Sequence, residues 1–380
     1  MNVPRRWAAA ACLSAACIAV VLGGCASGSP RPKPAPLTAN PAVIGVRQAW
    51  SLRLSPVTFP LQAQAQAGRV VLATDSGAVV TLDAATGREL ARADAGARLT
   101  AGVGTDGTVS AVMTQNNEVV AVQESQVLWR HRFASQSFTP PLVAGGRVFV
   151  LNADRSLSAL DGRTGRLLWS MPARADPLVL RQNGLLMAVG NTLVAGLSGR
   201  MTGIDPDTGS IRWEVPVAAA RGSNDVERLI DVVGGVARQG DVVCARAFQA
   251  AVGCIDAAHG SAVWSKPADG GTGLAGDGER IYGAESDGKL IAWNAANGER
   301  AWLNESLRWR DFSGPLVLGR SMVVGDATGQ VFWLARTDGA LLDRMPTDDS
   351  GVAAAPVVAA NTLVVVTRSG GVYGFRPQQQ

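Results

Sequence analysis

The sequence is poor in the side chains on which most metal, catalytic and nucleic-acid sites depend. Only two of its 380 residues are His, and neither stands beside a Cys or a carboxylate cluster, which argues against a zinc site and histidine-based catalysis. Four of the 35 Lys and Arg residues belong to the N-terminal leader and linker, so the rest of the chain has 31 of them against 31 Asp and Glu. A nucleic-acid-binding domain would carry a clustered basic excess, which this sequence lacks.

The composition also lacks the features of a disordered chain. Charged residues make up 17% and hydrophobic residues 47% of the sequence, so the chain is expected to fold. Aromatic residues are scarce at 5%, yet 10 of them are Trp, against 2 Tyr and 8 Phe. Such an excess of Trp indicates one structural position that is repeated many times.

The N-terminus has the pattern of an export signal. Two arginines precede an apolar run over residues 7–22, and the run ends in Leu-Gly-Gly-Cys at Cys25. This tetrapeptide resembles the lipobox of bacterial lipoproteins, which implies that residues 1–24 are a removed signal peptide and that Cys25 carries lipid. The alternative is an uncleaved anchor, because the run is about as long as a short membrane span. Ala26 stands where lipoproteins of the inner membrane typically carry Asp, so the resemblance implies the periplasmic face of the outer membrane.

Three further segments follow the lipidated cysteine. Residues 26–42 contain five prolines and no hydrophobic periodicity, which predicts a semi-extended tether over residues 25–42. Residues 43–377 form the folded body, and residues 378–380 are a short tail.

One pattern recurs through the body. Val-rich strands separated by Gly lead to a strand ending in Leu-Asp, then to Thr-Gly, then to a Trp four residues after the Gly. The clearest copy spans residues 140–169, and further copies close at 205–213, 256–264 and 294–302. In two weaker copies Ala91 and Asp343 stand at the Trp position, and Trp129 ends a copy without the Thr-Gly turn. We expect the turn Asp to accept backbone hydrogen bonds, the Gly to be left-handed and the Trp to stack over the next repeat.

The spacing of the repeats predicts the fold. The turn glycines at positions 165, 209, 260, 298 and 339 are 44, 51, 38 and 41 residues apart, a period of about 42 that suits four-stranded propeller blades. Eight such blades need about 336 residues, and the body supplies 335. The last repeat has only three strands, whereas residues 46–50 form an orphan strand ending in Trp. We therefore predict an all-β, eight-bladed β-propeller of four-stranded antiparallel blades, closed by the N-terminal strand.

Two other architectures fit the pattern poorly. A parallel sheet would need helical crossovers, and the sequence has no sustained helical periodicity. A β-solenoid would show a shorter and stricter period.

The repeat motif resembles that of the quinoprotein-dehydrogenase-like propellers, Ala-x-Asp-x-x-Thr-Gly-x-x-x-Trp. Within that group, the lipobox, the eight blades and two segments described below look like the outer-membrane protein assembly factor BamB family, over essentially the whole mature chain. The quinone enzymes hold their cofactor with adjacent cysteines, a catalytic Asp and a calcium shell. This chain has no adjacent cysteines, and its acidic residues mostly fall in the repeat turns. We therefore expect no catalytic residue, no cofactor and no metal. The alternatives are a periplasmic quinone (PQQ)-dependent dehydrogenase relative and a propeller that binds a small ligand.

Two cysteines remain in the mature body, in a compartment that permits disulfides. Cys244 and Cys254 lie on adjacent strands of one hairpin. A turn about Gln249 makes them face each other, whereas a turn centred between Gln249 and Ala250 puts them on opposite faces of the sheet. The sequence leaves both registers open.

The repeat is interrupted between Gly209 and Gly260 by about nine extra residues, which fall in residues 217–230 and are rich in alternating charge. Long loops on a rigid propeller are where binding surfaces are usually built. The preceding blade opens with Leu178 and Leu180, expected on one face of a strand, followed by Arg181. The alternative is that these leucines belong to the core and that the insertion is an idle loop.

The resemblance gives these segments a function. In the BamB family, a Leu-x-Leu-Arg segment and an Arg-Leu-x-Asp-x-Asp segment form the docking site for the periplasmic domains of the barrel-inserting protein BamA. The matching residues are Leu178, Leu180 and Arg181 in the first segment, and Arg228, Leu229 and Asp231 in the second. Val233 replaces the second acid. The resemblance implies a monomeric subunit of a hetero-oligomer that helps to deliver outer-membrane β-proteins, with unfolded forms of these proteins as possible clients.

Overall fold

The computed structural model describes residues 32–173, 178–219 and 230–378. The chain divides at Pro34, and the fold described here is that of the unit that begins at Ala35. The described residues contain no helix long and apolar enough to cross a membrane. Their regular structure consists of β-strands.

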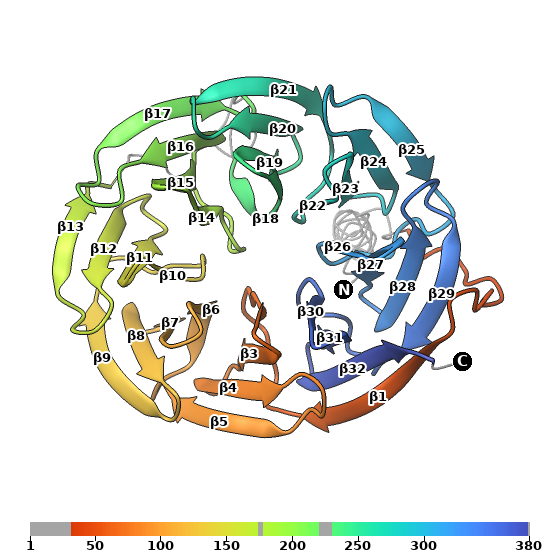
Figure 1. Cartoon of the computed structure of the whole chain (residues 1–380), viewed down its shortest axis with the longest axis horizontal. Helices are drawn as coiled ribbons and strands as arrows, with labels where there is room; N and C mark the ends of the chain where they lie inside the picture. The colour runs from red at the N-terminus through yellow and green to blue at the C-terminus, as the bar shows by residue number, and fades with distance from the viewer. Residues whose placement is uncertain (1–31, 174–177, 220–229, 379–380) are drawn as a thin grey trace, which may run out of the picture. The chain divides into compact units, whose positions relative to one another are not determined.

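Eight four-stranded antiparallel sheets follow one another around a ring (Figure 1). Blades 1 to 4 are β2 (Gln64–Gln66), β3 (Arg69–Ala73), β4 (Ala78–Asp83) and β5 (Glu89–Asp94); β6 (Leu99–Thr105), β7 (Ser110–Thr114), β8 (Glu118–Gln123) and β9 (Gln126–Arg132); β10 (Leu142–Ala144), β11 (Arg147–Leu151), β12 (Leu157–Asp161) and β13 (Leu167–Met171); and β14 (Leu186–Val189), β15 (Thr192–Leu197), β16 (Arg200–Ile204) and β17 (Ile211–Pro216).

Blades 5 to 8 are β18 (Val232–Gln239), β19 (Val242–Ala247), β20 (Ala251–Asp256) and β21 (Ser261–Pro267); β22 (Ala275–Gly276), β23 (Arg280–Ala284), β24 (Leu290–Asn294) and β25 (Arg300–Asn304); β26 (Leu316–Leu318), β27 (Ser321–Gly325), β28 (Gln330–Ala335) and β29 (Leu341–Pro346); and β30 (Val357–Ala359), β31 (Thr362–Val366) and β32 (Gly371–Pro377) with β1 (Val46–Arg53).

The N-terminal strand completes the last blade. β1 pairs antiparallel with β32, in a register that runs from Val46 opposite Pro377 to Arg53 opposite Gly371. The predicted eight-bladed propeller and its closure by the N-terminal strand are both confirmed.

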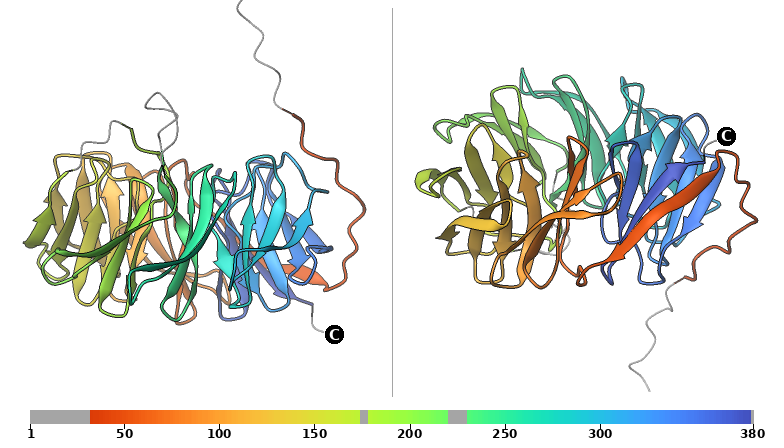
Figure 2. Two further views of the ribbon diagram at one scale, coloured as in Figure 1. Left: turned by 90° about the horizontal axis from the view of Figure 1, so that it is seen from above. Right: turned by 60° about the horizontal axis from the view of Figure 1, so that its bottom comes forward.

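The antiparallel connections emerge alternately at the two ends of the ring (Figure 2). The end that carries the first–second and third–fourth strand connections of each blade is called the turn face. The opposite end, which carries the second–third connections and the blade-to-blade connections, is called the loop face. The Thr-Gly motifs lie on the turn face.

Each blade packs against a neighbour on both sides, so its middle strands are buried on both faces. In β3, for example, Val70 and Leu72 point to one face of the sheet and Val71 to the other, and their exposed fractions are 0%, 1% and 8%. Burial of both sheet faces explains why these strands are continuous apolar runs in the sequence.

On the turn face, a Trp of one blade packs against the turn of the next blade, and this contact, called the lock, recurs around the ring. Trp129 on blade 2 donates its indole Nε1–H to the carbonyl of Gly162 on blade 3 over 2.9 Å. A β-carbon added to Gly165, whose φ is +70°, would lie 2.6 Å from the indole ring. The turn therefore needs Gly for space as well as for its left-handed conformation, a reason that the sequence did not reveal. Five other tryptophans donate in the same way to the next blade: Trp50, Trp169, Trp213, Trp264 and Trp302, to Ala84, Pro206, Ala257, Ala295 and Arg336.

The aspartate that opens the clearest motif stabilises its own turn. Asp161 Oδ1 accepts hydrogen bonds from the Thr164 hydroxyl at 2.8 Å, the Thr164 amide at 2.9 Å and the Arg163 amide at 3.1 Å. These bonds, that from the Thr164 hydroxyl foremost, lower the pKa of Asp161 below its ordinary value. The carboxylate form therefore holds the turn at neutral pH.

At two blade interfaces in the described part of the chain, another residue stands at the position of the locking Trp. Ala91 stands at the Trp position of blade 1, next to blade 2, where a short connection between β8 and β9 replaces the Thr-Gly turn. Asp343 stands at the Trp position of blade 7 and accepts hydrogen bonds from Asn40 Nδ2 at 2.8 Å and from the Val46 amide at 3.0 Å. It thereby holds the segment that enters β1.

The predicted tether is partly bound to the propeller. Residues 35–42 have no helix or strand, but the Ala35 amide donates to the Arg308 carbonyl at 2.9 Å. Farther along, the Val43 amide donates to the Leu342 carbonyl at 2.7 Å. The compact unit therefore begins at Ala35, eight residues before the boundary predicted from composition, because backbone groups of β29 and of the connection entering blade 7 bind this proline-rich strap.

Cys244 on β19 and Cys254 on β20 are directly opposite each other and joined by a disulfide. The hairpin turns about Gln249, whose φ is +47°. Both cysteines are buried, with exposed fractions of 3% and 0%.

We expect replacement of Trp129 by Ala to lower the free energy of unfolding by about 3–5 kcal/mol, because the variant loses a buried aromatic ring at the interface of blades 2 and 3. Urea unfolding followed by circular dichroism measures this loss. The control is Trp309→Ala, since Trp309 is 37% exposed and lies outside the repeated Trp positions. Equal losses in the two variants would contradict the lock.

We expect the double variant Cys244→Ala/Cys254→Ala to lose about 3 kcal/mol of unfolding free energy, because the bridge restricts the unfolded chain. The same urea titration measures the loss. Thiol labelling of the denatured, unreduced protein provides the control, with no free thiol expected from this pair; two free thiols would rule out the bridge.

Candidate functional site

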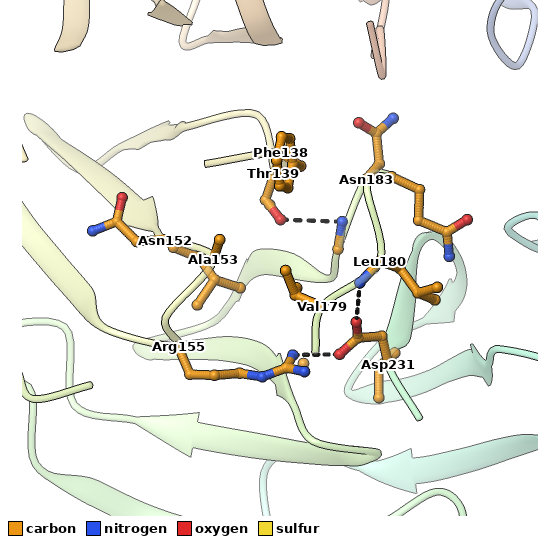
Figure 3. Close-up of a pocket in the computed structure, with 14 residues that line it drawn as sticks. Phe138, Thr139, Asn152, Ala153, Arg155, Val179, Leu180, Asn183 and Asp231 are labelled. Carbon is orange, nitrogen blue, oxygen red and sulfur yellow. Dashed lines mark hydrogen bonds and ion pairs between the residues drawn. The ribbon is translucent and has the colours of Figure 1, made fainter. Parts of the chain in front are cut away.

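The two segments singled out in the sequence lie close together on the loop face. The first, residues 178–181, belongs to the connection that enters blade 4. The second ends at Asp231, immediately before β18 of blade 5. Arg228 and Leu229 lie outside the described residues. Figure 3 shows the side chains around Asp231.

A buried ion pair connects these segments to blade 3. Arg155, in the turn between β11 and β12, forms a short charge-assisted contact with the Asp231 carboxylate. The two side chains are only 7% and 9% exposed. The other Asp231 oxygen accepts the Leu180 amide at 2.8 Å, and Arg155 also donates to the Leu178 carbonyl at 3.2 Å. Three consecutive blades thus converge on one carboxylate, as Figure 3 shows for Arg155, Leu180 and Asp231.

This arrangement gives Asp231 a role different from the expected one. The sequence suggested that its carboxylate supplies a polar contact to a partner, but Asp231 is 6% exposed and its oxygens bond within the chain. Val233, at the position of the missing second acid, is 4% exposed and pairs with Arg246 inside the sheet. Asp231 is therefore a buried residue that fixes the backbone of the exposed segment 178–181.

Among the described residues of the two segments, the side chains that reach solvent belong to the first. Leu178 is 39% exposed, whereas Leu180 is partly buried. Arg181 is exposed, and its guanidinium carbon lies 5.7 Å from the centre of the Phe138 ring. An arginine over an aromatic face is held by a cation–π attraction. The resulting surface has an apolar side chain next to an oriented cation.

The sequence assigned these residues to a strand, and this assignment is wrong. Strand β14 begins only at Leu186, and residues 178–181 form no strand. The Leu180 amide, which would otherwise pair with a neighbouring strand, donates to Asp231 instead. The Leu-x-Leu alternation therefore does not describe a two-sided strand here.

Sequence reasoning also missed Arg155 and Phe138. Neither stands at a defining position of the repeat motif or in the two singled-out segments, and Arg155 is 76 residues from its ionic partner. The available signal for Arg155 was its position in a turn that other blades build with glycine. Phe138 had no signal beyond its place in the connection entering blade 3.

A small cavity lies behind this surface. It has a volume of about 30 Å³ and is lined in part by Asn152, Gln182, Asn183 and Thr139. Such a volume has room for about one water molecule and is too small for an organic cofactor. Thr139 Oγ1 accepts the Gly184 amide at 3.1 Å on one side of the cavity (Figure 3).

A larger hollow lies at the centre of the ring. Its volume is about 600 Å³, and Arg181, Asp311 and Arg368 are among the residues around it. Asn183 narrows it by donating to the Leu61 carbonyl of the first blade at 3.1 Å. In the part of the chain that the structure describes, no three His, Cys, Asp or Glu side chains gather in the manner of metal ligands.

Comparison with known proteins agrees on one family. The family model described as outer membrane protein assembly factor BamB matches residues 63–304. The assembly factor BamB of Burkholderia pseudomallei (strain K96243) is 37% identical over 383 aligned residues, covering 100% of each chain. That of Bordetella pertussis is 32% identical, covering 98% of this chain and 97% of its own.

Solved structures give the same fold. The crystal structure of BamB from Moraxella catarrhalis has a TM-score of 0.80 at 25% identity and covers 87% of this chain and 99% of its own. The quinohemoprotein alcohol dehydrogenase from Comamonas testosteroni has a TM-score of 0.68 at 14% identity, covering 90% and 79%. At that identity the likeness to the dehydrogenase concerns the fold alone.

The family model covers more than half of the chain, and the two curated relatives match it over nearly their whole lengths. The propeller, its repeats and its lock between blades agree with this match. The chain belongs to the outer membrane protein assembly factor BamB family.

Proposed function

We propose that this chain is a non-catalytic scaffold of the machinery that assembles β-barrel proteins into the outer membrane. The observation that carries the proposal is the surface on the loop face, where Leu178 and Arg181 are exposed on a segment whose backbone is fixed by Asp231 and Arg155. The Asp231 carboxylate is occupied by bonds to Arg155 and to the Leu180 amide, which fix the backbone of the segment. Such a rigid surface suits protein docking better than catalysis.

The partner in this proposal is a BamA-type barrel protein, which docks through its periplasmic domains. Leu178 supplies apolar contact area, and Arg181, held over Phe138, supplies an oriented cation. Leu180 lies partly beneath them. Arg228 and Leu229 are included because they match the family's second docking segment. An apolar centre with charged groups around it is a common interface layout.

The proposed role in assembly is positional. A lipidated Cys25 would hold the protein on the periplasmic face of the outer membrane, where the partner's periplasmic domains also lie. Several acyl chains bind a membrane more firmly than one. Docking there keeps the propeller beside the site where barrel proteins insert, so that it aids their delivery; unfolded barrel proteins are candidate clients.

A quinone-dependent dehydrogenase is the second candidate, favoured by the shared fold with the alcohol dehydrogenase. We expect purified protein mixed with PQQ and Ca²⁺ to gain neither cofactor absorbance nor dye-reducing activity, because the sequence has no adjacent cysteines to cover a quinone. A spectrophotometric assay against a known quinone dehydrogenase as positive control measures both. Reconstituted dehydrogenase activity would overturn the scaffold proposal.

We expect the tagged lipoprotein, purified in detergent from native membranes, to bring down a large barrel protein with periplasmic domains. Arg181→Glu should reduce that protein by about tenfold or more, because it reverses the oriented charge beside the apolar centre of the surface. Quantitative mass spectrometry measures the ratio.

The matched control is Arg163→Glu, an equal charge reversal at an exposed arginine on the turn face of blade 3. It should leave co-purification unchanged. The proposal fails if the wild-type protein brings down no barrel protein, or if both reversals reduce it equally.

A further inference from the structure

The turn between the second and third strands of a blade contains a left-handed residue. In four blades this residue is glycine: Gly77, Gly288, Gly329 and Gly370. Blade 2 uses Asn117, blade 4 uses Ser198 and Gly199, and blade 5 uses Gln249. Blade 3 uses Arg155, with φ of +66°.

An arginine is an unfavourable choice for this position in two respects. Its β-carbon crowds the backbone in the left-handed conformation, which glycine adopts without strain. Arginine is also seldom buried, yet Arg155 is 6% exposed. Strained residues concentrate at functional sites, where the surrounding structure holds them in place. Both features indicate that the contacts of the Arg155 guanidinium hold this residue in place.

The guanidinium of Arg155 fixes the backbone of segment 178–181 both directly and through Asp231. It donates directly to the Leu178 carbonyl at 3.2 Å. It also pairs with Asp231, whose second oxygen accepts the Leu180 amide at 2.8 Å. The backbone on both sides of Val179 is thus fixed by one ion pair, and Leu178 remains exposed above it.

We propose that Arg155 is a positioning residue for partner docking: it presents the segment 178–181 in its binding conformation without touching the partner. The inference rests on the proposed function of that segment. Ordering a loop before binding removes part of the entropic cost of association, so loss of the clamp should weaken docking even in a well-folded protein.

The test uses the full-length lipoprotein in detergent and the purified periplasmic domains of the BamA-type protein from the same bacterium. The decisive variant is Arg155→Gly/Asp231→Asn. It removes both charges together, so no buried ion is left unpaired. Gly suits the left-handed turn, and the Asn oxygen can still accept the Leu180 amide. We expect unfolding stability close to that of the wild type.

The expected result is a dissociation constant about tenfold higher for the double variant, measured by biolayer interferometry. Amides 178–184 should also exchange hydrogen faster in the free protein. The matched control is Asn117→Gly, which places glycine at the corresponding left-handed position of blade 2, away from the Arg155–Asp231 pair. The affinity of this variant should equal that of the wild type.

The outcomes separate this inference from the proposed function. If the wild type binds and Arg181→Glu abolishes binding, but the stable double variant binds like the wild type, only the role of Arg155 is overturned. If the wild type does not bind the periplasmic domains, the proposed function itself fails. If the double variant does not fold, Arg155→Lys is the deciding variant, because lysine keeps the charge but lacks the forked guanidinium that reaches Asp231 and Leu178 together. Weaker binding with faster hydrogen exchange would support the role of Arg155. Unchanged binding would overturn it.

Discussion

Closure of the ring is the constraint on which the other features of the propeller depend. Each blade buries its faces only if it has a neighbour on both sides, and an open ring would leave two apolar sheet faces in water. The β1–β32 ladder provides that closure by joining the two ends of the chain. At this seam the repeated lock is replaced: Asp343 occupies the Trp position and binds the segment that enters β1. The departure from the repeat thus occurs where the chain ends must meet.

The turn face and the loop face differ in how regular their contacts are. On the turn face the same bonds recur in six pairs of blades, with Trp donating to the following turn and Gly making room for the indole. This face sets the geometry of the ring. On the loop face the connections differ from blade to blade, and Arg155, Leu180 and Asp231 join three of them into one surface. Regular packing at one end therefore leaves the other end free to vary.

The sequence was sufficient for the fold because the fold follows from a local rule. Each Asp-x-x-Thr-Gly turn and its Trp are near each other in the chain, so counting them counts the blades, and the orphan strand ending at Trp50 shows how the ring closes. One pattern in the sequence was not used for the prediction. Blade 1 has Ala91 in place of the Trp, and the next blade, blade 2, has no Thr-Gly turn. The Trp and the turn are absent together, as expected if the indole packs against the Gly of the next blade's turn.

The site was less predictable for a physical reason. Its segments were found by pattern, but the fate of Asp231 depends on Arg155, which is far away in sequence and comes from a different blade. No periodicity encodes such a pair. The predicted strand at residues 178–181 failed for the same reason, since a distant carboxylate takes the amide that a strand would use.

The strap over residues 35–43 has a mechanical consequence. A pull on the chain ahead of Ala35 reaches β1 only after passing the bonds that Ala35, Asn40 and Val43 form with blade 7 and its entry. Those bonds would bear the load first and in sequence. The β1–β32 ladder that closes the ring is therefore shielded from tension applied to the N-terminal side of the strap.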